Sequence, residues 1–250
     1  MLNLSVARPK PVVRRYQAGT KSFSLNQKLS DQIRESAKRH GVTLFMFLVS
    51  AFQALLYRHS GLDDICVGTP TAGRNTSLTR SLIGFFVNTL VLRTNLSENP
   101  TFQELLRRVR ETCLEAFDHA DVPFEAVVAE LQPERNPSHH PLFQVWFVLQ
   151  NQPGSTLGMT GVNLSEIDVR LPTTIFDLAL SVHEGDQLNG SAIYDTDLFA
   201  EEAISELLGH FETFLAEAVN DPTKRILAIE LDAKDVSTQL ISMPEVDFAF

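Results

Sequence analysis

The segment NPSHHPLFQ, residues 136–144, holds the one pair of adjacent histidines in the chain, His139 and His140. Histidine serves widely as a general base and as a metal ligand, so this pair is the first place to look for chemistry. A metal site is disfavoured, because adjacent side chains on a loop point apart and no third ligand lies at a usable spacing. The segment therefore predicts a solvated pair of loop histidines.

Two other polar segments could carry chemistry. Arg74 lies in the turn TAGRN after an apolar run, where a side chain can project from a sheet edge toward a partner surface; the plain alternative is an exposed arginine. The segment DHADVPFE brings together His119, Asp121 and Glu125. An acidic residue near a helix start satisfies free N–H groups and suits the helix dipole, which favours a structural role for this cluster.

Hydrophobic periodicity predicts the elements that must position these residues. Four start and stop signals support the helices: Ser30 as an N-cap with Gly41 as a stop, Thr43 as the next N-cap, and a capping box of Thr101 and Glu104. Helices are predicted at 30–41, 43–61, 100–120, 123–132 and 197–222. Strands are predicted at 21–26, 63–70, 87–96, 142–150, 162–170, 175–184, 188–194 and 225–231.

Two of these elements carry the core. Helix 43–61 is apolar nearly all round and is predicted to be central, and helix 100–120 places Phe102, Val109, Cys113 and Phe117 on one face. Strand 142–150 is a continuous apolar run, typical of a strand covered on both faces. The order of elements predicts an α/β sandwich with helices on a largely central sheet.

Composition excludes several classes. The chain has 250 residues, a net charge of −10 and a pI near 5.1, which argues against binding to nucleic acid. It has two cysteines, Cys66 and Cys113, which predict reduced, buried thiols. No signal-peptide core and no 18-residue apolar window occur, so we expect a cytoplasmic protein without a membrane span. Residues 1–20 predict an extended linker, 21–232 a folded unit and 233–250 a polar tail.

Four segments together resemble a known family. DDICVGTPTAGR, LIGFFVNTLVLRTNL, HADVPFEAVVAELQPERNPSHHPLFQVWFVLQ and YDTDLF occur in this order, and the chain from about residue 8 to about residue 232 is similar to the C-terminal lobe of a nonribosomal peptide synthetase condensation domain. The resemblance implies one lobe of the chloramphenicol acetyltransferase-like fold, with helices packed on a mixed, mostly antiparallel sheet. In that fold two similar lobes form a V around an active-site tunnel.

The resemblance also implies an activity. Condensation domains join an acyl or peptidyl thioester to the amine of an aminoacyl thioester, both presented on phosphopantetheine arms of carrier proteins, and bind no cofactor directly. Their catalytic signature, HHxxxDG, belongs to the N-terminal lobe. Aligned to it, His139 and His140 are followed by Gln144 and Val145 at the Asp and Gly positions, and the segment instead matches the family's R-[D/N]-x-S-x-x-P-L motif. The histidine pair is therefore not the catalytic motif, and no catalytic residue is expected in this chain.

The remaining candidates take their roles from the resemblance. It implies that Arg74 pairs with the Asp of HHxxxDG and so braces the histidine loop; without that lobe, its guanidinium is expected to have no partner. Asn88 begins a core strand of the family, where a hydrogen-bonding role is the default and a share in the tunnel wall the alternative. Trp146, Val148 and Gln150, or the opposite face of their strand, would line the tunnel; the plain alternative is that Trp146 is only core.

Arg107, Arg108 and Arg110 give helix 100–120 a basic side. The ordinary interpretation is a solvated face paired with Glu104 and Glu111, and the sharper one is docking of an acidic carrier protein. The expected partners are an N-terminal lobe carrying HHxxxDG, carrier proteins or a second copy of the chain. We thus expect the acceptor-side half of a condensation domain. A non-catalytic module that recruits a carrier protein or enzyme is the alternative, and a free-standing acyltransferase using coenzyme A is weaker, because it also needs a tunnel histidine.

Overall fold

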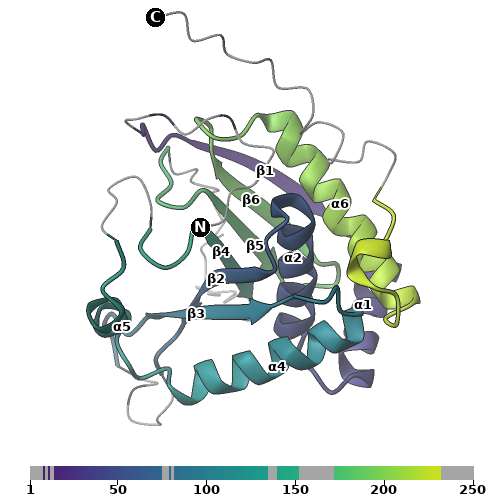
Figure 1. Cartoon of the computed structure of the whole chain (residues 1–250), viewed down its shortest axis with the longest axis horizontal. Coiled ribbons are helices and arrows are strands. Elements are labelled where there is room, and N and C mark those ends of the chain that lie inside the picture. Colours follow the sequence, from purple (N-terminus) through teal and green to yellow (C-terminus); the bar gives the residue numbers. More distant parts are fainter. Residues whose placement is uncertain are drawn as a thin grey trace, which may run out of the picture.

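The computed structural model describes residues 8, 11, 14–74, 79, 82–134, 140–151 and 172–231. These residues form a six-stranded sheet with a layer of helices packed on one face (Figure 1). The strands are β1 Ala18–Ser24, β2 Asp64–Thr71, β3 Asn88–Asn95, β4 Val145–Gln150, β5 Leu178–His183 and β6 Asn189–Asp195. Their order in the sheet is β1-β6-β5-β4-β2-β3.

The sheet is mixed and mostly antiparallel, as predicted. β4 runs parallel to both of its neighbours, β2 and β5, and the other three pairings are antiparallel. The pairing of β2 with β4 is short, since only Val67 and Gly68 lie opposite Val145 and Trp146. Both strands continue beyond these positions, so their carboxyl ends separate.

The helices are α1 Gln27–Arg39, α2 Leu44–Ser60, α4 Phe102–Asp118, α5 Phe124–Leu131 and α6 Glu201–Asn220. In Figure 1, α2 crosses the sheet between α4 and α6. Twelve of its residues are buried, which confirms the predicted central helix. Rings from several elements meet there: Phe52 lies 5.8 Å from Phe147 of β4 and 6.3 Å from Phe211 of α6, measured between centroids.

The helix caps were predicted correctly at two of three starts. Thr43 caps α2, and Thr101 and Glu104 form the capping box of α4. The prediction for Ser30 was wrong, because α1 begins earlier and Asn26 is its N-cap. Ser30 is buried inside the helix, where its hydroxyl donates to the Asn26 carbonyl and accepts from the Leu188 N–H.

Three other predictions need correction. Strand 142–150 was predicted to be covered on both faces, but among the described residues its side chains alternate, with Val145 and Phe147 buried and Trp146 and Val148 half-buried. Phe117 is 41% exposed, because it lies at the end of α4 beyond the core. Segment 225–231 forms a 3-10 helix, Ile226–Ala228, with one isolated bridge between Arg225 and Thr101 in place of a strand. The predicted strand 162–170 lies outside the described residues.

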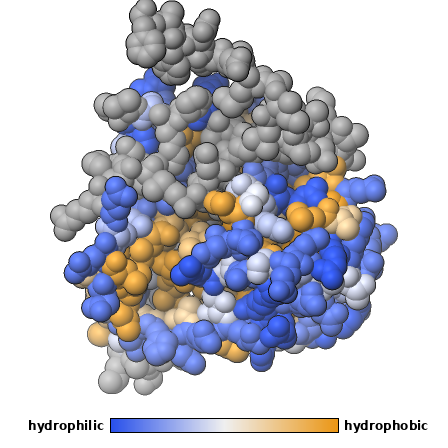
Figure 2. Space-filling model, viewed as in Figure 1, coloured by the Kyte–Doolittle hydropathy of each residue, from blue (hydrophilic) through white to orange (hydrophobic). Residues whose placement is uncertain are grey.

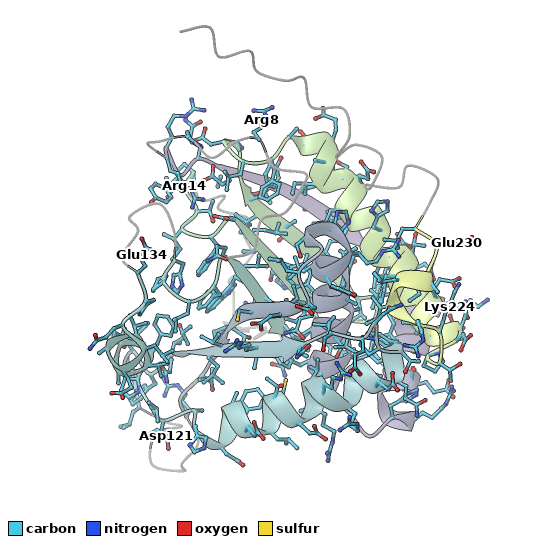
Figure 3. The ribbon with its side chains drawn as sticks, in the orientation of Figure 1. Arg8, Arg14, Asp121, Glu134, Lys224 and Glu230 are labelled. Carbon is cyan, nitrogen blue, oxygen red and sulfur yellow. The ribbon has the colours of Figure 1, made fainter. Side chains whose placement is uncertain are left out.

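The leading segment joins the fold earlier than predicted. β1 begins at Ala18, and Arg14 is already buried at the end of the sheet where β1 starts (Figure 3). Its guanidinium pairs with two buried carboxylates, those of Asp177 and Asp195. The boundary of the predicted linker at residue 20 therefore falls inside the folded unit, while the division of the chain into linker, lobe and tail stays a prediction.

Among the described residues, no single helix is long and apolar enough to cross a membrane. The pair α1 and α2, bent by 105°, passes the same test of length and composition only when taken together. Most of α2 is buried in the core of the fold.

Candidate functional site

Arg74 lies in the loop that joins β2 to β3, directly after Gly73, whose φ of 61° is in the left-handed region. Its guanidinium donates to the carbonyl oxygens of Thr79 and Leu82, each at 2.6 Å, and to that of Gly84 at 3.3 Å. It also lies over the Phe86 ring, 4.5 Å from the centroid. The expectation that Arg74 would lack partners without a second lobe was therefore wrong, because its own loop surrounds it.

The partners of Arg74 leave its positive charge uncompensated. Carbonyl oxygens and an aromatic face carry no net charge, and no carboxylate in the described part of the chain forms an ion pair with Arg74. The bracing of a histidine loop on another lobe stays a prediction.

Exposed apolar side chains surround this arginine. Ile83 and Phe85 are 104% and 90% exposed, and Leu82 and Val87 are about half exposed, at 53% and 48%. We call these four residues the apolar loop patch. Figure 2 shows hydrophobic side chains gathered on the side of the molecule where α5 lies. Large exposed apolar side chains grouped in one loop are typical of an interaction site.

A cavity of about 700 Å³ opens where the carboxyl ends of β2 and β4 separate. Thr69–Ala72 and Val148–Asn151 form two of its walls, the start of α2 a third, and Val87, Leu114 and Phe117 complete it. None of the described residues that line it is charged. We call it the strand-end pocket.

The strand-end pocket includes two of the three predicted tunnel residues from β4. Val148 and Gln150 line it, together with their neighbour Leu149. Trp146 does not line it; its ring stacks on that of Phe176, with centroids 4.9 Å apart and planes 7° apart. The lining of a tunnel by these residues stays a prediction, but the structure separates Trp146 from the other two.

His140 belongs to the same aromatic cluster as Trp146. Its ring lies 4.0 Å from that of Phe143 and stacks on Phe124 at 5.3 Å. The prediction of a solvated loop residue was thus wrong for His140, and burial lowers its pKa. Gly68 makes room for this cluster, because a Cβ there would lie 2.2 Å from the Phe143 ring. His139 lies outside the described residues.

Asn88 has the structural role that was its default interpretation. Its amide donates to the carbonyls of Ala120 and Val122, at 2.9 and 2.7 Å, and its oxygen accepts from the Phe124 N–H at 3.1 Å. Asn88 therefore ties the start of β3 to the turn between α4 and α5, the DHADVPFE segment.

The three arginines of α4 differ in what they contact. Arg107 pairs with Glu111 at 2.9 Å, as the helical spacing predicted. Arg108 donates to the carbonyls of Asn95 and Ser97 at the end of β3. Arg110 is exposed and forms no ion pair with the described residues. Carrier docking by this face stays a prediction. Arg110 has the fewest contacts of the three arginines among the described residues.

The described residues contain no group of three or more His, Cys, Asp or Glu side chains that could hold a metal ion. Cys66 is half-buried and Cys113 buried, and neither forms a disulfide. Burial raises the pKa of both thiols, that of Cys113 to about 12, so neither suits a nucleophile.

Sequence reasoning missed the helical side of the strand-end pocket. Leu114 and Phe45 line it, and neither was among the predicted site residues. Leu114 had a detectable signal, because it is an apolar residue outside the buried stripe of α4 and is 44% exposed. Phe45 had none, since its helix is apolar nearly all round.

Comparison with known proteins assigns the family. The model of the condensation domain matches residues 1–241. Chondramide synthase cmdD of Chondromyces crocatus is 43% identical over 92% of this chain and 6% of its own length. A probable non-canonical nonribosomal peptide synthetase, CymA, of Salinispora arenicola (strain CNS-205) is 36% identical over 99% of this chain and 3% of its own length.

A solved structure of the X-domain with OxyB from teicoplanin biosynthesis contains a chain of the same fold, with a TM-score of 0.82 and 26% identity over 91% of this chain and 51% of that one. The chain thus spans a few per cent of the curated relatives and about half of this structural relative. It belongs to the condensation domain family.

Proposed function

We propose that this chain is the acceptor-side half of a condensation domain, which forms an amide between carrier-bound acyl or peptidyl and aminoacyl thioesters. The catalytic HHxxxDG loop would come from an N-terminal lobe, since the motif does not occur in these 250 residues. The substrates would arrive on phosphopantetheine arms of carrier proteins, and the chain would supply one wall of the tunnel.

One observation carries the proposal: the uncompensated charge of Arg74 lies within the apolar loop patch. A positive charge held in fixed geometry beside exposed apolar residues suits a surface that receives a carboxylate together with apolar side chains. An Asp at the end of an HHxxxDG loop has that chemistry. The match to about half of the X-domain chain is consistent with a chain that makes up one of two lobes.

Reconstitution tests this proposal. Mixing the chain with a separately produced N-terminal lobe that carries HHxxxDG, and with two loaded carrier proteins, should yield an amide product detectable by mass spectrometry. The chain alone should yield none. His140→Phe should keep the activity of the mixture, because His140 packs among rings. Amide formation by the chain alone that is abolished by His140→Ala would contradict the proposal.

The structure also gives reason to expect association. Because the apolar loop patch is exposed, we expect a tight complex with an N-terminal lobe or self-association of the chain. Light scattering of the chain with and without the lobe measures this. A monodisperse monomer at high concentration that does not bind the lobe would count against the proposal.

A second candidate function is a recruitment module without catalysis. It is favoured by the teicoplanin X-domain, a relative whose solved complex contains OxyB. In this case neutralising Arg107, Arg108 and Arg110 should weaken binding of a carrier protein or enzyme, while Arg74→Ala changes nothing measurable. A half-enzyme predicts the reverse pattern, so the two sets of variants separate the functions.

A further inference from the structure

The strand-end pocket has a composition that the fold alone does not require. Its lining residues are apolar or uncharged polar, on a chain of net charge −10. Leu114 and Phe117 line it and remain 44% and 41% exposed, although both are large apolar side chains. A cavity of about 700 Å³ lies within the range of small-molecule sites, roughly 300–1,000 Å³.

Its position also suits a ligand. In open sheets with parallel strands, ligands bind at the carboxyl ends of the strands where neighbouring connections diverge. β2 and β4 are parallel, pair only through Val67–Gly68 and Val145–Trp146, and then separate to form this pocket.

The pocket shares a wall with the loop that Arg74 organises. Ala72 and Val87 line the pocket, and they lie at the two ends of the loop whose carbonyls accept from Arg74. The spacing between these two walls therefore depends on the closed form of the loop. A ligand in the pocket would lie beside the surface assigned above to the second lobe.

We propose that the strand-end pocket receives the apolar side chain of the carrier-bound aminoacyl or peptidyl group, and so selects substrates by hydrophobicity. The identity of this ligand rests on the proposed function. The selection follows from the lining: Phe45, Leu114 and Val148 offer dispersion contacts, and the described lining residues include no cation that could pair with a carboxylate. Leucine-like and phenylalanine-like groups fit this chemistry, and aspartyl and lysyl groups do not.

Direct binding to the full chain tests the pocket. The probes are leucine and aspartate joined by an amide to aminopantetheine, which are hydrolysis-resistant stand-ins for the thioesters, measured by calorimetry. We expect the leucyl probe to bind at least about tenfold more tightly, since one methylene in an apolar pocket already gives about 10- to 200-fold discrimination. Equal affinities, or no binding of the leucyl probe at millimolar concentration, would overturn the proposal.

A matched pair of variants locates the site. Leu114→Glu places a carboxylate at the mouth of the pocket and should remove the preference for the leucyl probe. Leu227→Glu is the control, because Leu227 is also 44% exposed and does not line the pocket. Phe117→Glu is a second pocket variant, should Leu114→Glu fail to fold by circular dichroism. A leucyl preference that survives the folded pocket variants would overturn the assignment.

The outcomes for the pocket and for the proposed function are separable. A leucyl preference lost in Leu114→Glu, combined with failed reconstitution of condensation, would keep the pocket and reject the half-enzyme. Successful reconstitution with no side-chain preference in binding would keep the half-enzyme and reject the pocket.

Discussion

Two arginines divide the molecule into a part that the chain completes alone and a part that it does not. Arg14, at the end of the sheet where β1 starts, is buried and pairs with the carboxylates of Asp177 and Asp195 (Figure 3). Arg74, in the β2–β3 loop, contacts carbonyl oxygens and the Phe86 ring, without an ion pair in the described residues.

The difference separates two environments for an arginine. A buried guanidinium with two carboxylates has its charge neutralised inside the fold, which favours a structural role. A guanidinium held by neutral groups has no charged partner among the described residues, as the proposed contact with a second lobe requires. Both are the same residue type in polar segments of the sequence, and only their partners separate them.

The largest effect is expected from Arg14→Ala. Removing this cation takes away the buried positive charge that both carboxylates contact, and we expect the free energy of unfolding to fall by about 3–5 kcal/mol. Urea denaturation measures the change. Arg15→Ala is the neighbouring control: Arg15 pairs with Asp197 but its side chain is 68% exposed, so solvent screens the pair and the loss should be clearly smaller than in Arg14→Ala. Equal losses of unfolding free energy in Arg14→Ala and Arg15→Ala would show that the buried ion pairs of Arg14 have no special weight, and the contrast between Arg14 and Arg74 would fail.

The pH dependence of stability tests a second buried group, His59, in the part of the fold that includes Arg14. His59 of α2 is buried with its Nε2 3.3 Å from Nδ1 of His210, and burial first, then the charges of His210 and Arg58, lower its pKa to about 4. The carboxylate of Glu206 lies 4.0 Å from Nε2 of His210, the other nitrogen of that ring. Between pH 6.5 and 4, His59 is therefore protonated in the unfolded chain and neutral in the folded chain.

Stability contributed by the neutral His59 is present above pH 6.5 and is lost as the pH falls toward 4, by about 3 kcal/mol in total. Urea unfolding at pH 7, 6, 5 and 4.5 measures this loss. His59→Gln, which keeps a polar side chain beside His210, should flatten the series by that amount. An unchanged slope in His59→Gln would show that other groups carry the pH dependence.

Two glycines with positive φ test whether the geometry of the Arg74 loop matters. Gly61 and Gly73 have similar positive φ values, 68° and 61°, but a Cβ at Gly61 meets no atom within 4 Å, whereas one at Gly73 would lie 1.9 Å from the Phe86 carbonyl oxygen. Gly61→Ala should lower the free energy of unfolding by roughly 1 kcal/mol, the cost of the left-handed conformation. Gly73→Ala should cost roughly 2 kcal/mol and also displace the Arg74 loop.

The displacement predicts a functional difference between these alanine variants. Reconstituted condensation and binding of the leucyl probe should fall in Gly73→Ala and stay unchanged in Gly61→Ala. If both variants behave alike in these assays, the geometry of the Arg74 loop does not matter for either activity.

The elements with a strong local signal could be predicted from the sequence. The apolar run of α2 and the capping box of Thr101 and Glu104 are readable within one or two helical turns. The start of α1 could not be decided locally, because Asn26 and Ser30 are both good N-caps four residues apart. Ser30 is inside the helix because its hydroxyl accepts from Leu188, 158 residues away in sequence.

The candidate site was only partly predictable for the same physical reason. Arg74, Val148 and Gln150 were identified by their resemblance to family motifs, but the carbonyls that hold Arg74 depend on how its loop folds back. The strand-end pocket depends on where β2 and β4 stop pairing. That separation is a property of two strands far apart in sequence, and no periodicity within either strand encodes it.

The central claim is that the charge of Arg74 serves a second lobe, and Arg74→Ala tests it most directly. The rate of condensation should be measured in the mixture of this chain, an HHxxxDG-bearing lobe and loaded carriers, alongside the urea stability of the chain. We predict at least a tenfold loss of rate, which corresponds to about 1.4 kcal/mol on the barrier, with unchanged carrier binding. The free energy of unfolding should fall by about 1–3 kcal/mol, because three hydrogen bonds to loop carbonyls are lost. Undiminished condensation by a folded Arg74→Ala chain would contradict the account.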